Sequence, residues 1–392
     1  MRMVKIFVFI LFILLSIAFI LKYEKNIPYF YIGLELFLVL ILMAIRSGRP
    51  RVKALFFNLA IVILVFSLAE AHAAGWFLGK NNRFAKREGS HFSRQYYRDD
   101  DIRGHAAAKN ISVTGKLTKG NKVVYDVLYS TNRYGLRVSP HDLRLAGDKT
   151  RSDFKNAVFF GCSFTVGEGL NDNETLPYLF EERSRGRYRS YNFGFHGYGP
   201  HQMLRIIETG LLDEVIADKK PALAVYLALI EHVERVCGNY PQVFFGSCGP
   251  RYQLDSSGEI KYTGKIRNKF VASVMVKMCR SHLIRNTLTK LFGWKRTPED
   301  LRLFLKVIEK SKELFTQKYN ADFYVLLWTN RSDKDYDYVL SELKRKNIKV
   351  ITTEEIFRKY DDPEENYLIK NDGHPNKLAN ERMADYLLEN IR

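Results

Sequence analysis

The apolar residues of this chain of 392 residues are unevenly distributed and gather in the first eighty positions. Three apolar stretches, 4–21, 29–45 and 54–78, reach or approach the length of a helix that crosses a hydrocarbon core about 30 Å thick. Beyond them, short apolar runs alternate with amphipathic stretches, as in a globular domain. The pattern predicts a membrane domain of three transmembrane helices over 1–79, followed by a globular part.

The first apolar stretch differs from a cleaved signal peptide. Arg2 and Lys5 supply a basic start, but the apolar run is longer than the roughly 7 to 15 residues of a signal core. No small-x-small cleavage pattern follows it at 22–26. We therefore expect an uncleaved helix.

Charges in the short loops predict the orientation of these helices. Basic residues lie before the first stretch and in the loop 46–53, whereas the loop between the first two stretches is only weakly basic. The positive-inside rule places both basic segments in the cytoplasm and the domain after residue 80 outside it, periplasmic or extracellular. Four basic residues within 80–87 favour the opposite orientation by the same rule.

The remaining chain divides into a lead-in and a larger domain. Residues 80–119 form a polar juxtamembrane linker and then a β-like stretch at 111–114, which continues at 123–129 as a small antiparallel lead-in. From 120 to 392 we expect one α/β domain, interrupted at about 238–296 by an insertion. The insertion holds a loop rich in Pro, Gly and Ser and a basic apolar helix, 269–292, that either caps the site or lies on the membrane.

Within the larger domain, strand and helix patterns alternate. Strands are predicted at 157–161, 188–193, 222–230, 322–328 and 348–351. Helices are predicted at 174–183, 200–212, 298–319, 336–346 and 377–391. Continuous apolar strands separated by helices are typical of a parallel sheet covered on both faces. The fold class predicted is α/β, a doubly wound parallel sheet preceded by three transmembrane helices.

Charge and cysteine content narrow the choice of partners. A net charge of +18 suits an anionic partner, but the basic residues are dispersed and form no nucleic-acid motif, so a membrane surface or an envelope polymer is expected and nucleic acid is not. Cys237 and Cys248 are close enough for a loop-closing bridge, and free thiols are the alternative. The oligomeric state stays open.

Ser163 is the candidate nucleophile. It follows the first buried strand and is flanked by Gly161, Gly167 and Gly169, which permit tight backbone beside a substrate. Ligands of open α/β sheets bind at the carboxyl ends of the strands, where Ser163 would lie. A serine hydroxyl needs a base, and His374 in the loop before the last helix is suited to that role, with Asp372 orienting its ring.

Other candidate residues also follow strands. The backbone N–H groups of Ser163 and Gly197 are expected to bind the oxyanion, and Asn192 and His196 to contact substrate. The short-range spacing needed for a metal site is absent among Cys162, His196, His232 and His374, so neither a metal nor a cofactor is expected.

These motifs in this order resemble the SGNH, or GDSL-like, hydrolase superfamily. The matching pieces are 161–163, 192–197 and 372–375, and the resemblance covers roughly 120–392 with a lead-in that ends at 134–137. It implies the flavodoxin-like three-layer fold and ester chemistry through an acyl-serine. Two positions depart from the family pattern. Cys162 replaces an aspartate, and Glu231 and His232 occupy the place of an oxyanion asparagine, so either His232 donates or only the backbone does.

Together with the predicted transmembrane helices, the resemblance implies a membrane-tethered serine esterase or acyltransferase. Its substrate would be an O-acyl group on a glycan or lipid of the cell envelope, with the acyl group and the acceptor left open. The alternative is a domain that keeps the fold, has little activity and serves as a glycan-binding or assembly component.

Overall fold

The computed structural model describes residues 29–73, 85–90, 93, 95–143, 153–216, 220–238, 248–266, 278, 281, 283, 284, 287, 295–360 and 364–391. The chain divides into two compact units, and each is described by itself. The helical segments 29–73 and the described residues between 273 and 293 belong to the first unit. The predicted span 4–21 and most of the predicted helix 269–292 lie outside the described residues.

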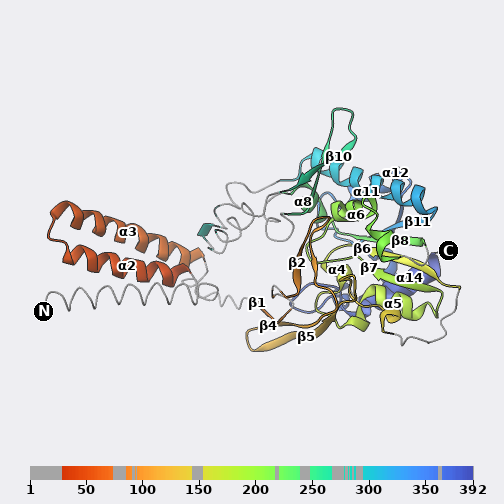
Figure 1. Cartoon of the computed structure of the whole chain (residues 1–392), viewed down its shortest axis with the longest axis horizontal. Coiled ribbons are helices and arrows are strands. Elements are labelled where there is room, and N and C mark those ends of the chain that lie inside the picture. Colours follow the sequence, from red (N-terminus) through yellow and green to blue (C-terminus); the bar gives the residue numbers. More distant parts are fainter. Residues whose placement is uncertain are drawn as a thin grey trace. The chain divides into compact units, whose positions relative to one another are not determined.

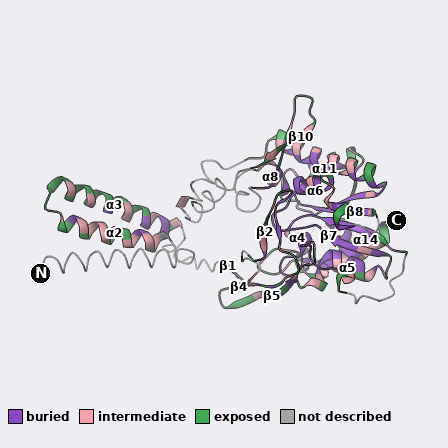
Figure 2. Cartoon of the chain, in the orientation of Figure 1, coloured by how far each residue is buried: buried purple, intermediate pink, exposed green. Residues whose placement is uncertain are grey.

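Two apolar helices, α2 (Tyr29–Arg46) and α3 (Pro50–Ala73), pack against each other in the first unit (Figure 1). Small side chains permit this close approach, since a Cβ added to Gly33 would lie 1.9 Å from Oγ of Ser67. Many large apolar side chains on both helices are exposed (Figure 2). In the described part of the chain one helix, α3, is long and apolar enough to cross a membrane, whereas the sequence predicts three such spans.

Part of the predicted insertion belongs to this helical unit. Glu70 near the end of α3 is buried, and its Oε2 accepts hydrogen bonds from Oγ of Ser281 at 2.7 Å and from the backbone N of Leu283 at 2.8 Å. The insertion is therefore shared between the two units rather than belonging wholly to the α/β domain.

The second unit is built on a five-stranded parallel sheet with the order β12-β11-β8-β6-β7. Its strands are β6 (Lys155–Phe160), β7 (Tyr188–Asn192), β8 (Pro221–Ala228), β11 (Asp322–Leu327) and β12 (Lys349–Thr352). Numbered along the chain this is the order 2-1-3-4-5 of a flavodoxin-like doubly wound sheet, in which the first and third strands flank the switch point. The predicted parallel α/β architecture is confirmed.

Helices cover both faces of this sheet (Figure 1). One layer comprises α5 (Leu176–Arg183), α13 (Thr353–Arg358) and α14 (Lys377–Asn390). The other comprises α6 (Pro200–Glu208), α7 (Leu211–Val215), α8 (His232–Cys237), α11 (Pro298–Tyr319) and α12 (Tyr336–Arg345). Successive strand residues face opposite layers, so Phe159 of β6 packs with the α5 and α14 layer and Phe160 with the α6 and α11 layer.

Local sequence signals explain several helix ends. α11 begins with a capping box in which Oγ1 of Thr297 accepts from the backbone N of Asp300 and the Asp300 carboxylate accepts from the backbone N of Thr297. The predicted helix 200–212 is two helices instead, because Gly210 has a φ of 75° and cannot continue an α-helix.

Small antiparallel sheets lead into the domain and fill part of the insertion. The predicted antiparallel lead-in corresponds to β4 (Ser112–Lys119) and β5 (Lys122–Ser130), which pair with each other. The stretch predicted as a linker also holds strands, namely β1 (Ala85–Glu88), which pairs with β4, and the hairpin of β2 (Tyr97–Asp100) and β3 (Gly104–Ala107). The insertion holds a hairpin that the sequence analysis missed, β9 (Pro250–Leu254) and β10 (Ile260–Lys265). Its turn is held by Asp255, whose Oδ1 accepts from the backbone N of Ser257 and of Glu259. Cys237 and Cys248 carry free thiols.

Candidate active site

Ser163 lies just beyond β6, at the switch point of the sheet. The strand ends at Phe160, Gly161 turns the chain with a φ of 149°, and Ser163 is the first residue of the short helix α4 (Ser163–Val166). A Cβ on Gly161 would lie 2.1 Å from Oγ1 of Thr165 and 3.0 Å from the carbonyl oxygen of Leu227. Only glycine therefore fits the turn that presents the serine at the carboxyl end of the sheet.

Replacing Gly161 with alanine is expected to destabilise the domain by about 1–3 kcal/mol, because the turn would be strained and the new methyl group would clash. The activity should fall as well, since the backbone that carries Ser163 must shift. Gly264→Ala is a matched control, because Gly264 also has a positive φ but a Cβ there meets no neighbour. Thermal unfolding of both variants in detergent measures the two losses of stability. If Gly161→Ala and Gly264→Ala lose equal stability, the clash with Thr165 and Leu227 is not what makes glycine necessary at 161.

The loop that carries Asp372 and His374 is closed by its own backbone. The carbonyl oxygen of Ile369 accepts from the N–H groups of Asp372 and Gly373, each at 3.0 Å, and the N–H of Ile369 donates to the carbonyl oxygen of His374 at 2.7 Å. Gly373 has a φ of 92°, which suits glycine in so tight a turn. The loop thus fixes both side chains just before α14.

Ser163, His374 and Asp372 form a linear hydrogen-bonded series. Oγ of Ser163 lies 2.9 Å from Nε2 of His374, and Nδ1 of the same ring lies 2.5 Å from Oδ2 of Asp372. The side chain of Asp372 is fully buried and that of His374 is 13% exposed. A carboxylate can only accept, so Nδ1 carries the proton and Nε2 is left to accept from the serine hydroxyl. This arrangement can deprotonate the serine.

The two backbone N–H groups predicted to bind an oxyanion make no hydrogen bond within the described structure. In the described part of the chain, the N–H groups of Ser163 and Gly197 donate to no protein acceptor. The loop of Gly197 is joined to the serine turn, since the N–H of Phe195 donates to the carbonyl oxygen of Gly161 at 3.2 Å. Both predicted donors therefore come from connected loops at one end of the sheet.

Asn192 has a different position from the one expected of a substrate contact. Its side chain is buried, Nδ2 donates to the carbonyl oxygen of Thr165 at 3.0 Å, and Oδ1 accepts from the N–H of Gly194 at 3.1 Å. Both ends of the amide thus tie the loop after β7 to α4. Asn192 is therefore placed as a support of this loop, and its contact with substrate stays a prediction.

His232 also fails to reach the place expected of it. The residue is fully buried, and its Nδ1 accepts from the Tyr226 hydroxyl at 2.6 Å. Burial, together with the nearby charge of Arg235, holds the pKa of His232 well below its usual value. An imidazole enclosed in this way presents no face to substrate, so the structure does not support its oxyanion role. Glu231 lies beside Asn330, whose Nδ2 is 3.4 Å from the Glu231 carboxylate.

Buried histidines give the domain a predicted sensitivity to acid. Burial lowers the pKa of His105 to about 4, that of His201 to about 3, and that of His232 well below its usual value. The unfolded chain binds these three protons below about pH 6.5 while the folded domain does not, so the stability present above that pH is lost as the pH falls. The expected slope is about 3–4 kcal/mol per pH unit between about pH 6 and 5, at about 1.4 kcal/mol for each proton that only the unfolded chain binds.

Unfolding of the detergent-solubilised chain at pH 7, 6 and 5 measures this slope, and proton uptake on unfolding at pH 5.5 provides an independent check. A stability that stays flat over this range would show that the folded domain binds protons at these imidazoles as readily as the unfolded chain does.

His196 is brought to the site together with a carboxylate that the sequence analysis did not single out. Oε2 of Glu168 lies 3.0 Å from Nδ1 of His196 and 3.5 Å from Nε2 of His374. The side chains of Glu168 and His196 are 7% and 6% exposed. An acidic residue between two glycines of the nucleophile loop was the available signal for Glu168 in the sequence.

Arg137 fixes the loop that follows the nucleophile. Its side chain is 1% exposed, and its nitrogens donate to four backbone carbonyl oxygens and one carboxylate. These acceptors are the carbonyls of Val166 at 2.8 Å, Gly167 at 2.6 Å, Leu170 at 2.5 Å and Leu128 at 3.0 Å, and Asp172 at 2.8 Å. One guanidinium thus joins the lead-in sheet to both sides of Glu168.

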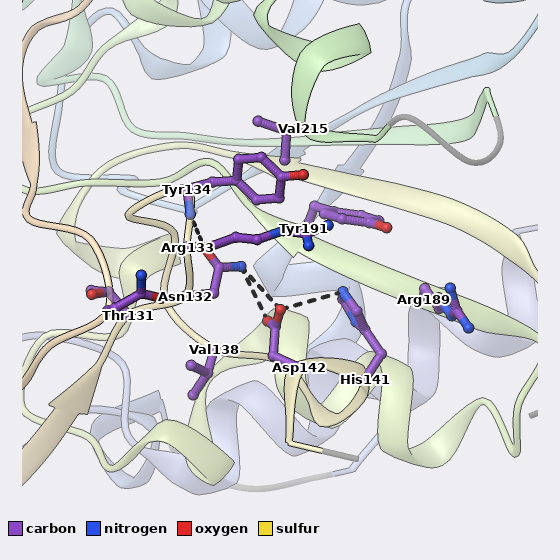
Figure 3. Close-up of a pocket in the computed structure, with 11 residues that line it drawn as sticks. Thr131, Asn132, Arg133, Tyr134, Val138, His141, Asp142, Arg189, Tyr191 and Val215 are labelled. Atoms are coloured by element: carbon purple, nitrogen blue, oxygen red, sulfur yellow. Dashed lines mark hydrogen bonds and ion pairs between the residues drawn. The ribbon is translucent and has the colours of Figure 1, made fainter. Parts of the chain in front are cut away.

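A separate cavity of about 570 Å³ lies beside β7 and the segment that ends in Arg137 (Figure 3). Tyr134 and Tyr191 line it, and the Asp142 carboxylate accepts from Nδ2 of Asn132. None of Ser163, Asp372 and His374 lines this cavity. Within the described residues, no group of three or more His, Cys, Asp or Glu side chains is arranged to hold a metal ion.

Comparisons with known proteins find similarity among solved structures. No family model and no curated protein matches the chain. A putative lipolytic protein of the G-D-S-L family from Desulfitobacterium hafniense is 14% identical with a TM-score of 0.36, covering 60% of this chain and 98% of its own. The SGNH-hydrolase family esterase AlinE4 is 14% identical with a TM-score of 0.31, covering 61% and 95%. A catalytic mutant of Axe2, an acetylxylan esterase from Geobacillus stearothermophilus, is 12% identical with a TM-score of 0.33 and covers 61% and 95%.

Proposed function

We propose that this chain is a membrane-attached serine hydrolase of the SGNH type, an esterase or O-acyltransferase that forms an acyl-enzyme on Ser163. The series Ser163, His374 and Asp372, with distances of 2.9 and 2.5 Å, carries the proposal. Its place at the switch point of a doubly wound sheet supports it, because ligands bind there in open α/β sheets.

The reaction begins with transfer of the Ser163 hydroxyl proton to Nε2 of His374 as Oγ attacks the ester carbonyl carbon. Asp372 stabilises the imidazolium, and the N–H groups of Ser163 and Gly197 hold the oxyanion of the tetrahedral intermediate. The intermediate collapses when the bond to the alcohol oxygen breaks and His374 returns the proton to that oxygen. The product is an acyl-serine and a free alcohol.

The second half of the reaction distinguishes an esterase from a transferase. His374 takes a proton from water or from an acceptor hydroxyl as that oxygen attacks the acyl-serine carbonyl carbon, and a second tetrahedral intermediate forms. This intermediate collapses when the bond to Oγ of Ser163 breaks and His374 returns the proton to Oγ. Water releases the carboxylic acid, whereas an acceptor hydroxyl receives the acyl group. We propose an O-acylated glycan or lipid of the cell envelope as the substrate, because tethering concentrates the enzyme beside substrates of the same surface.

Membrane attachment is supported by the length and composition of α3 and by the exposed apolar side chains of α2 and α3. The proposed orientation follows the basic loop 46–53, which favours the cytoplasm and leaves the catalytic domain on the outer side. Three spans in total are proposed, with 4–21 as the first.

A fluorophosphonate probe tests the proposal directly, because it reacts with an activated serine and forms a stable adduct. We expect the full chain in detergent to be labelled, and Ser163→Ala to lose the labelling. Ser93→Ala is a control in the lead-in, outside the catalytic series. Absence of labelling in folded wild-type chain would overturn the enzyme and favour the binding or assembly role, which the Glu231 carboxylate in place of an oxyanion donor would then explain.

A further inference from the structure

The position of Glu168 relative to His374 is not explained by the catalytic series alone. Asp372 already binds Nδ1 of the His374 ring at 2.5 Å, so a second carboxylate is not needed to orient it. Glu168 lies instead on the opposite side of the ring, with Oε2 3.5 Å from Nε2, the nitrogen that exchanges a proton with the reacting oxygens.

This side of the ring is where the alcohol part of an ester must lie. An oxygen that receives a proton from Nε2 as it leaves, or gives one as it attacks, must come within about 3 Å of that nitrogen. A carboxylate oxygen 3.5 Å from the same nitrogen therefore borders the position of the alcohol oxygen. Glu168 is therefore close to the place that the alcohol part of an ester would occupy.

The carboxylate is held in this position by its surroundings. Nδ1 of His196 donates to Oε2 of Glu168 at 3.0 Å, and the His196 ring packs among the aromatic rings of Tyr96, Tyr97 and Phe195. Arg137 donates to backbone carbonyl oxygens that precede and follow Glu168 in the chain, those of Val166, Gly167 and Leu170. The N–H of Gly169 donates to the Tyr129 hydroxyl at 2.8 Å. A side chain fixed in this way is preorganised for a ligand.

We propose that Glu168 forms an alcohol-side subsite that selects esters of polyhydroxylated alcohols, with a hydroxyl next to the ester oxygen donating to its carboxylate. This inference rests on the proposed function and narrows its substrate class. A nearly buried carboxylate accepts hydrogen bonds and cannot donate them, so it favours a neighbouring hydroxyl, as in a sugar ring, and disfavours a neighbouring anion. A long-chain alcohol without a second hydroxyl gains nothing from it.

A matched pair of substrates tests the subsite. One is a mono-O-acetyl methyl glucoside with free neighbouring hydroxyls, and the other is the same ester with those hydroxyls methylated. The full chain in detergent is expected to favour the free form in kcat/KM by about tenfold to a hundredfold, the size of one hydrogen bond to a charged group. Glu168→Gln should reduce this preference at least about tenfold, because a neutral amide accepts more weakly. Glu182→Gln, an exposed carboxylate on α5, should leave it unchanged.

The preference ratio separates substrate recognition from support. If Glu168 only positions His196 or His374, then Glu168→Gln lowers both rates by the same factor and the ratio stays constant, which overturns the subsite. If the wild-type chain has equal kcat/KM for the free and the methylated substrate, the subsite is overturned without any variant. The test therefore does not depend on whether Glu168→Gln folds. A wild-type chain that is labelled by the fluorophosphonate yet shows no preference refutes this inference alone, whereas one that is neither labelled nor active on either ester refutes the proposed function.

Discussion

Replacing His374 with alanine is expected to lower kcat for ester hydrolysis by about 10⁴- to 10⁶-fold, because Ser163 then loses the imidazole that its Oγ contacts at 2.9 Å. Asp372→Asn should lower kcat by about 10⁴-fold while keeping the side chain in place, since an amide favours the wrong tautomer of the ring. Rates with a soluble acetate ester, measured on detergent-purified chain, give both values. The fold should survive, because these side chains lie in a loop and not in the sheet.

The combined variant makes this prediction specific to a catalytic series. Ser163→Ala together with His374→Ala should be no slower than Ser163→Ala alone, because groups that act as one unit lose their effect together. If the factors by which the two single changes lower kcat multiply in the double variant, His374 acts independently of the serine. His141→Ala is a suitable control, since His141 binds Glu181 at 2.8 Å, outside the series.

Replacing Arg137 with methionine is expected to destabilise the domain by about 3–5 kcal/mol, the usual cost of removing one partner of a buried ion pair. Asp172 would lose its cation, and four backbone carbonyl oxygens would lose their donor. Arg137→Lys should recover only part of this loss, because an ammonium group cannot reproduce the planar set of five donors. Denaturant unfolding followed by tryptophan fluorescence measures both variants.

Arg133→Met provides the matched control for this prediction. Arg133 lies four residues earlier, is exposed and lies 4.9 Å from the Tyr134 ring centroid. Its replacement should change the free energy of unfolding by less than about 0.5 kcal/mol. If the Arg133 and Arg137 variants lose equal stability, the hydrogen bonds of Arg137 contribute little, and the loop that carries Glu168 must be held by other contacts.

Much of the α/β domain could be predicted from the sequence because its signals are local. Continuous apolar strands and amphipathic helices repeat with different periods, and a strand buried on both faces has no polar alternation to obscure it. The Thr297 cap is also a local signal, since it depends on residues within a few positions, whereas the need for glycine at 161 comes partly from the carbonyl oxygen of Leu227 on a neighbouring strand. The hairpin at 250–265 was missed because its strands are short and one of them is largely exposed.

The membrane part shows where a compositional pattern stops being sufficient. The predicted stretches 29–45 and 54–78 overlap the helices α2 and α3, although α3 begins at Pro50 and ends at Ala73, and 74–78 lies outside the described residues. Apolar length is a property of sequence, but whether a helix faces lipid or protein depends on its neighbours. The burial of Glu70 against Ser281 depends on a segment more than two hundred positions away.

The sequence by itself determined the chemistry available to this protein: a serine after a buried strand, a histidine and an aspartate before the last helix, and glycines where the backbone must turn. These depend on short-range patterns, because turn geometry and strand burial are encoded over a few residues. Only the tertiary structure decided which polar groups meet. It brought Ser163 and His374 together across 211 positions, buried Asn192 and His232, and placed Glu168 beside His374 with Arg137 supporting its loop. Such contacts depend on how distant segments pack, and no local pattern records the distance between them.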